Sequence, residues 1–192
     1  MAAAQASTRS KLLTLYLVAL SADGTVLAIG APYQNGGPGY VRVHWDGALW
    51  VQRSGDLGGD STGDRFGRAV ALSADGSVLA IGAPLSSNSR GYARVFDWNG
   101  AQWVRRSGDL DGDGADDRNG ESVALSADGS VVAVGAWYDQ GGPGRVRVHD
   151  WTDAPRIHPD TEVRCTNLIY TVPSVCFTPH GESGADQVCQ GT

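Results

Sequence analysis

The sequence predicts an all-β protein built from three tandem copies of one four-stranded antiparallel unit. The segment VALSADGTVLAIGAP at residues 18–32 recurs almost unchanged at 70–84 and again at 123–137. Ser21, Ser73 and Ser126 occupy equivalent places, which gives spacings of 52 and 53 residues. Apolar and polar residues alternate within each copy, and glycines recur at fixed places between the alternating runs, as they do in turns between short strands.

The second copy shows how a unit divides into strands. Residues 68–73 (RAVALS) predict a first strand, Asp75-Gly76 a hairpin turn, and 77–83 (SVLAIGA) an antiparallel second strand. After a Ser-rich loop, 91–98 (GYARVFDW) predict a third strand, Asn99-Gly100 a second turn, and 101–108 (AQWVRRSG) a fourth strand. One inserted residue near Asp97 accounts for the longer of the two spacings.

A sheet of four short strands cannot bury both of its faces alone, so the copies must stack on one another. Four strands per unit favour the blades of a β-propeller, and three units fall below the usual four to eight blades. We therefore expect an incomplete propeller of about three blades. The chain divides into an N-terminal segment at 1–17, three β repeats at 18–152 and a non-repeating tail at 153–192.

Composition restricts the classes of partner. The chain of 192 residues is 41% hydrophobic and 19% charged, within the range of globular proteins, and its net charge of −6 disfavours nucleic acid as a partner. No apolar run is long enough to predict a transmembrane segment. Arg9 and Lys11 precede an apolar stretch at 12–20, which has the outline of a secretory signal. Because residues 18–24 also match the later repeats, the N-terminal segment is either a signal peptide or a blade edge.

The stretch FGRAVALSADGSVLAIGAP, from Phe66-Gly67 to Gly82-Ala83-Pro84, resembles the FG-GAP repeat of integrin α-subunit propellers. The resemblance covers residues 18–152, although the third copy has Asn119-Gly120 at the first motif and the first copy has Thr14-Leu15 there. It implies a binding scaffold, extracellular or at the cell surface, with loops that contact a protein or glycan ligand. The family holds calcium between the first two strands of a blade, where this chain has only tight Ala-Asp-Gly turns.

A different loop has the spacing of a calcium site. Between the second and third copies, carboxylates and a glycine follow the pattern DxDxDGxxD, in which the carboxylates would supply oxygen ligands and the glycine the sharp bend. The residues are Asp109, Asp111, Asp113, Gly114 and Asp117. Position 12 is Gly120, so the loop is not an EF-hand. The alternative is an acidic, solvated loop whose carboxylates bond nearby backbone amides.

Aromatic and basic residues recur at equivalent places in the copies. For the tryptophans flanking the last hairpin, recurrence favours cross-strand packing over a glycan-stacking platform; they are Trp45, Trp50, Trp98, Trp103 and Trp151. Trp137 replaces the proline of Gly-Ala-Pro, so it and Tyr138 could be exposed and functional. His44 and His149 stand where the second copy has Phe96, which indicates aromatic packing rather than metal binding. Arg42, Arg94 and Arg147 predict an exposed or inter-blade polar row.

The tail carries the cysteines, Cys165, Cys176 and Cys189, whose odd number permits one disulfide and one free thiol. The sequence has no nucleophile elbow, HExxH, phosphate-binding loop or dinucleotide fingerprint, so we predict no enzyme activity. Two functions remain: a non-catalytic binding or adhesion scaffold, or a structural element that self-associates through an open blade edge or belongs to a larger propeller.

Overall fold

The computed structural model describes residues 17–33, 36–47, 49–138 and 143–151 in full, and the backbone of 161–164. The first sheet holds β1 (Leu17–Leu20), β2 (Val26–Ala31), β3 (Tyr40–Asp46) and β4 (Trp50–Gln52) in that order, and β5 (Leu57–Gly58) pairs with the other end of β3. All pairings in this sheet are antiparallel.

The second sheet repeats this arrangement. It contains β6 (Ala69–Leu72), β7 (Val78–Ala83), β8 (Tyr92–Trp98) and β9 (Trp103–Arg105), with β10 (Leu110–Asp111) on the other end of β8. The short helix α1 (Ser86–Ser89) lies in the Ser-rich loop. The third sheet runs β11 (Asn119–Leu125), β12 (Val131–Ala136), β13 (Arg145–Asp150) and β14 (Thr161–Arg164).

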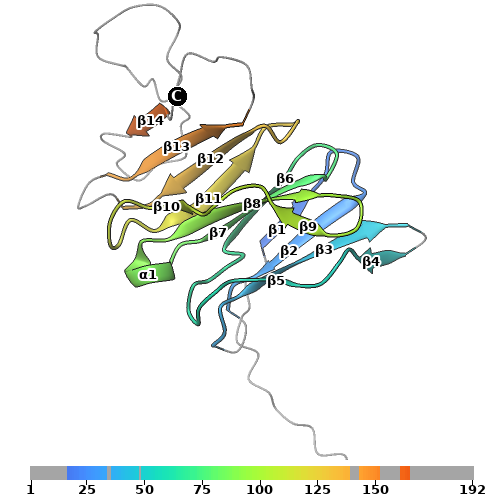
Figure 1. The fold of residues 1–192 in the computed structure, drawn as a ribbon, viewed down its shortest axis with the longest axis horizontal. Helices are drawn as coiled ribbons and strands as arrows, with labels where there is room; N and C mark the ends of the chain where they lie inside the picture. Colours follow the sequence, from blue (N-terminus) through green and yellow to red (C-terminus); the bar gives the residue numbers. More distant parts are fainter. Residues whose placement is uncertain (1–16, 34–35, 48, 139–142, 152–160, 165–192) are drawn as a thin grey trace, which may run out of the picture.

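The three sheets stack face to face in chain order, as Figure 1 shows. One core cluster joins the first sheet to the second, for example through Val26 and Val43 against Leu79 and Phe96. A second cluster joins the next pair, with Val78 and Val95 among the residues packed against Val132. The prediction of an all-β fold made of tandem four-stranded antiparallel blades is confirmed, and the described residues form three blades of an incomplete propeller.

Each boundary joins two different blade faces. The face toward the following blade carries small side chains, such as Val78, Ala80 and Gly82 in β7, whereas the opposite face carries the larger Leu79 and Ile81. Alternation along the strand puts these two sets on opposite sides of the sheet. The short repeated sequence VLAIG therefore encodes both halves of a blade-to-blade contact.

Glycines allow the closest approach between blades. A Cβ on Gly82 would lie 2.0 Å from the carbonyl oxygen of Gly120, and one on Gly30 would lie 2.2 Å from that of Gly67. Gly67 and Gly120 have φ angles of +88° and +87°, in the region of positive φ that favours glycine. The glycines of the first two Gly-Ala-Pro motifs, Gly30 and Gly82, thus pack on the glycines that open the second and third blades.

The turn between the first two strands has one structure in all three blades. In the second blade the Ser73 hydroxyl donates to Asp75 Oδ1 at 2.7 Å and accepts from the Val78 amide at 2.9 Å. The same bonds form from Ser21 and Ser126. They explain why serine and aspartate recur with glycine in SADG.

The strand pairing corrects one detail of the sequence alignment. Trp45 pairs across from Val26 as Asp97 does from Val78, and the loop that follows is one residue longer in the second blade. The inserted residue therefore lies in the hairpin turn at 99–102, which gives its place more exactly than the sequence, where it was only near Asp97. As a result Trp45, not Asp46, occupies the place of Asp97.

The third blade takes its fourth strand from the segment that follows the repeats. β14 pairs with β13 along Arg145–Val148, although its residues lie in the non-repeating tail. The rest of the tail, with its three cysteines, and residues 1–16, with the possible signal peptide, lie outside the described residues. In the part of the chain that the structure describes, no helix is long and apolar enough to cross a membrane.

Candidate functional site

The predicted calcium loop is built around arginines of neighbouring strands. Asp109 accepts from Arg94 Nε at 2.6 Å and from Arg94 Nη2 at 3.0 Å, and Arg105 donates to it at 2.5 Å. Asp113 is paired with Arg145 and Arg147 of the third blade. Asp111 lies in β10 and is exposed.

Asp117 organises its own loop. It is fully buried and accepts from the amides of Asp113 and Gly114, both at 2.8 Å, and from Arg145 Nη2 at 3.2 Å. Asp64 repeats this role between the first and second blades, where it accepts from the Ser61 amide at 3.0 Å and lies 3.4 Å from the Tyr92 hydroxyl. These loops thus link each blade to the third strand of the next.

The arginines supply positive charge where a cation would have to lie. Burial alone would lower the pKa of Arg94, but its bonds to Asp109 and Asp60 outweigh burial and the pKa is raised. Within the described residues, no group of three or more His, Cys, Asp or Glu side chains is placed to hold a metal ion. Calcium at the Asp109 loop stays a prediction. Of its alternative, the bonds from backbone amides are present at Asp117, but this side chain is buried and the loop carboxylates Asp109 and Asp113 are paired with arginines.

The tryptophans differ between the blades. In the second blade Trp98 and Trp103 pair across strands with ring centroids 5.4 Å apart, and Trp103 is buried, which confirms cross-strand packing there. In the first blade Trp45 and Trp50 are 49% and 46% exposed and lie across from Val51 and Asp46, so they do not pair with each other as Trp98 and Trp103 do. The cause is the shorter hairpin, which places Trp45 across from Val51 and turns it toward the second blade.

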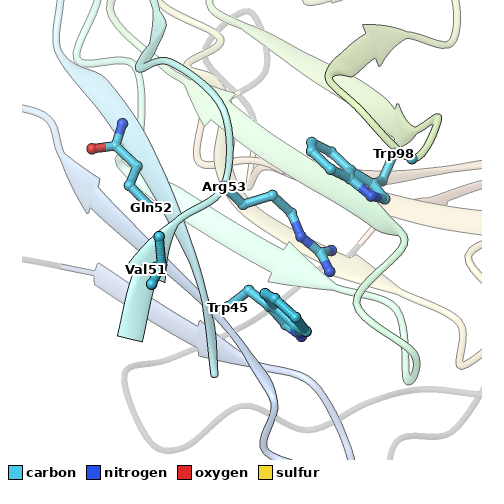
Figure 2. A pocket seen from close by; sticks show the side chains of 6 residues that line it. Trp45, Val51, Gln52, Arg53 and Trp98 are labelled. Atoms are coloured by element: carbon cyan, nitrogen blue, oxygen red, sulfur yellow. The ribbon is translucent and has the colours of Figure 1, made fainter. Parts of the chain in front are cut away.

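Trp45 borders a groove of about 320 Å³ between the first and second blades. Its lining residues are Trp45, Val51, Gln52, Arg53, Trp98 and Gly100. Figure 2 shows the Arg53 side chain extending between the two indole rings, one from each blade. The Arg53 guanidinium lies over the Trp98 ring at 4.7 Å from its centroid. Apolar ring surfaces next to a cation are typical of a small ligand site.

Arg106 is the equivalent arginine at the second boundary, and its surroundings provide an internal comparison. It lies over Trp151 at 5.3 Å and donates to the carbonyl of Gly129, as Arg53 donates to Gly76 at 3.4 Å. Arg106 Nε also donates to Asp97 at 3.0 Å and its Nη2 at 2.5 Å. Arg53 has no carboxylate partner among the described residues, because Trp45 stands where the second blade has Asp97.

Burial lowers the pKa of Arg53. A guanidinium remains charged at neutral pH regardless of a shift of this kind. The groove therefore holds a full positive charge that is partly removed from water and that no carboxylate of the described residues neutralises.

The other residues singled out in the sequence lie apart from this groove. Trp137 and Tyr138 are exposed at 61% and 47%, and Arg118 lies over the Trp137 ring. His149 stacks on Trp151, which agrees with aromatic packing. Arg42, Arg94 and Arg147 form ion pairs with aspartates, and those of Arg94 and Arg147 cross a blade boundary. Sequence reasoning missed the groove because its asymmetry depends on the length of one hairpin.

Comparison with known proteins adds a fold-level likeness only. No protein family and no curated protein sequence matches the chain. Solved structures similar to it include TolB from Acinetobacter baumannii, with 17% identity, a TM-score of 0.47 and coverage of 79% of this chain and 32% of that one. Hydrazine synthase from Kuenenia stuttgartiensis has 17% identity and a TM-score of 0.49, over 78% of this chain and 36% of that one.

A third similar structure is described as a putative TolB from Agrobacterium tumefaciens, with 12% identity and a TM-score of 0.33 over 82% of this chain and 64% of that one. The chain thus spans about a third of the first two structures. Such similarities carry no information on function. The class of protein is defined by the chain's own architecture, three stacked propeller blades with a groove at the first boundary.

Proposed function

We propose that the chain is a non-catalytic binding scaffold whose ligand site is the groove between the first and second blades. The absence of catalytic motifs in the sequence supports a binding role over an enzymatic one. The resemblance to FG-GAP repeats supports the same role and an extracellular or cell-surface setting for it.

The observation that carries this proposal is the exposure of Trp45 beside Arg53, which has no carboxylate partner in the described part of the chain. The exposed indole offers apolar surface for a ligand to cover, and the guanidinium beside it, which contacts Trp98 and the Gly76 carbonyl, offers a positive charge for a ligand to meet. Both features become favourable when a ligand covers the indole and meets the charge.

The proposal is tested by binding measurements on a panel of soluble glycans and peptides, with variants inside and outside the groove. We expect Trp45→Ala or Trp98→Ala to weaken binding and Trp137→Ala, an exposed tryptophan elsewhere, to leave it unchanged. Equal loss in all three variants, or binding that survives in the groove variants, would overturn the assignment of the site.

A second candidate function, self-assembly, is favoured by the two end faces of the stack. Val18 and Leu20 on β1 are 65% and 56% exposed, whereas the equivalent Val70 and Leu72 pack against the first core cluster. At the other end Val131 and Ala133 are half-buried, whereas the equivalent Val78 and Ala80 are buried. The first blade thus exposes a face of large side chains, and the third blade exposes a face of small side chains. Faces of these two kinds pack against each other at the boundaries inside the stack.

This candidate is tested by sedimentation at increasing protein concentration. A second copy stacked on the end faces predicts a mass that rises with concentration and that Leu20→Lys returns to that of the monomer. Leu49→Lys, at a 77% exposed position in a hairpin turn, is the matched control and should keep the association. A monomer at all concentrations would remove this candidate and leave the binding proposal standing.

A further inference from the structure

The groove at the first blade boundary points to a particular chemical class of ligand. This inference rests on the proposed binding function and specifies what the groove binds. The starting observation is that the two blade boundaries use the same arginine in the same way, except for one carboxylate.

Both arginines lie at the start of the link that follows the fourth strand and reach across to the next blade. Arg53 and Arg106 each donate to a glycine carbonyl in the Asp-Gly turn of that blade, and each lies over its tryptophan. At the second boundary Asp97 holds Arg106 with both carboxylate oxygens. Asp97 and Arg106 thus form a bidentate ion pair, the geometry that a guanidinium and a carboxylate favour.

At the first boundary the corresponding position is Trp45, which presents an indole in place of the carboxylate. The remaining space is the groove, with ring surfaces on both sides of the guanidinium. The first boundary therefore has the arginine without the carboxylate, and apolar ring surface lies around the guanidinium.

We propose that the groove binds a carboxylate attached to a ring, with the carboxylate on Arg53 and the ring against Trp45 or Trp98. The carboxylate would take the role that Asp97 has at the second boundary. Both aromatic acids and sugar acids have this chemistry, and the experiment separates them by their rings.

The test uses ligand-observed NMR of the full chain with four small probes in two matched pairs. Benzoate is compared with benzamide, and glucuronate with glucose, so that each pair differs in its negative charge and little else in the ring. We expect the acid of at least one pair to bind about tenfold more tightly than its neutral partner, the effect of a charge-assisted bond partly open to water. The pair that responds identifies the ring.

Four variants locate the effect. Arg53→Gln should abolish the preference for the acid. Trp45→Asp should also abolish it, because the new carboxylate reproduces the Asp97 pairing and occupies Arg53, whereas Trp45→Ala should weaken binding but keep the preference. Asp97→Ala frees Arg106 and should create a second, weaker site for the acid.

The outcomes distinguish this inference from the function on which it rests. Neutral and acidic probes that bind equally well, in a manner sensitive to Trp45→Ala, would keep the groove as a binding site and overturn the carboxylate. An acid preference that survives both Arg53→Gln and Trp45→Asp would also overturn it. No binding of any probe, together with no groove-dependent binding in the glycan and peptide panel, would overturn both.

Discussion

Replacing Gly82 by alanine tests whether the glycine contacts between blades hold the stack together. Gly82 lies in β7 with ordinary strand geometry, so alanine is acceptable to the backbone and only the space matters. The added Cβ would lie 2.0 Å from the Gly120 carbonyl oxygen, and Cβ atoms essentially never approach other atoms below 3.0 Å. The third blade must therefore move away by about 1 Å at this point.

A gap of this size removes a quarter to a half of the contact energy of the atoms along it, and overpacking of a tight interior costs about 1–3 kcal/mol. Because the obstruction is backbone and cannot rotate away, we expect the upper end, about 3 kcal/mol. For a folded part of this size that corresponds to a fall in Tm of roughly 10 °C.

Thermal unfolding followed by circular dichroism measures this change. Gly108→Ala is the matched control, since a Cβ there meets nothing within 4 Å and the residue has no positive φ. We expect the control to stay within about 0.5 kcal/mol of the wild type. A Gly82→Ala protein as stable as the control would refute the stacking of Gly82 on Gly120.

Four further predictions follow from the same contacts. Arg94→Gln leaves Asp109 and Asp60 without their shared buried partner and should lower the free energy of unfolding, measured by chemical denaturation, by about 3 kcal/mol. Arg42→Gln removes an exposed pair with Asp56 and should lower it by less than about 1 kcal/mol. Ser73→Ala removes a buried hydroxyl with two bonds and should lower the free energy of unfolding by about 1–2 kcal/mol, while the exposed Ser107→Ala should not. Serine hydroxyl bonds lower the pKa of Asp23, Asp75 and Asp128, that of Asp128 to about 2. The stabilisation from these carboxylates is therefore complete above their pKa in the unfolded chain, about 4, and is lost as the pH falls through their lower pKa in the folded protein. We expect Tm to be level from neutral pH down to about 5 and to fall steeply below about 4. Tm should be the same in millimolar calcium as in a chelator, because Asp109, Asp113 and Asp117 already have arginine partners. A rise in Tm of several degrees with calcium would instead establish the calcium loop.

Much of the fold can be predicted from short-range sequence patterns that recur in the repeats. The SADG turn, the alternating strand VLAIG and the glycine that opens each blade need only short-range geometry, so sequence reasoning reaches them. The repeats do not locate the strand Thr161–Arg164, because it lies in the tail, where no repeat pattern marks a strand.

The site was harder to predict because it depends on a difference between copies. Matching Trp45 to Trp98 in the sequence suggested the same packing for both, whereas the pairing of β3 with β4 shows that a shorter turn puts Trp45 in the place of Asp97. The partners of the acidic loop were hidden for another reason. Arg94 reaches Asp109 because β10 pairs with β8 within the second blade, and Arg145 reaches Asp113 and Asp117 because the third blade stacks on the second.

The most direct test of the proposed binding site is the response of the six tryptophan indole N–H signals in an NMR titration with a ligand that binds the chain. The groove predicts that the signals of Trp45 and Trp98 move together and saturate, while those of Trp50, Trp103, Trp137 and Trp151 stay near their starting positions. Movement centred on Trp137, or on no tryptophan at all, would contradict the assignment of function to the boundary between the first two blades.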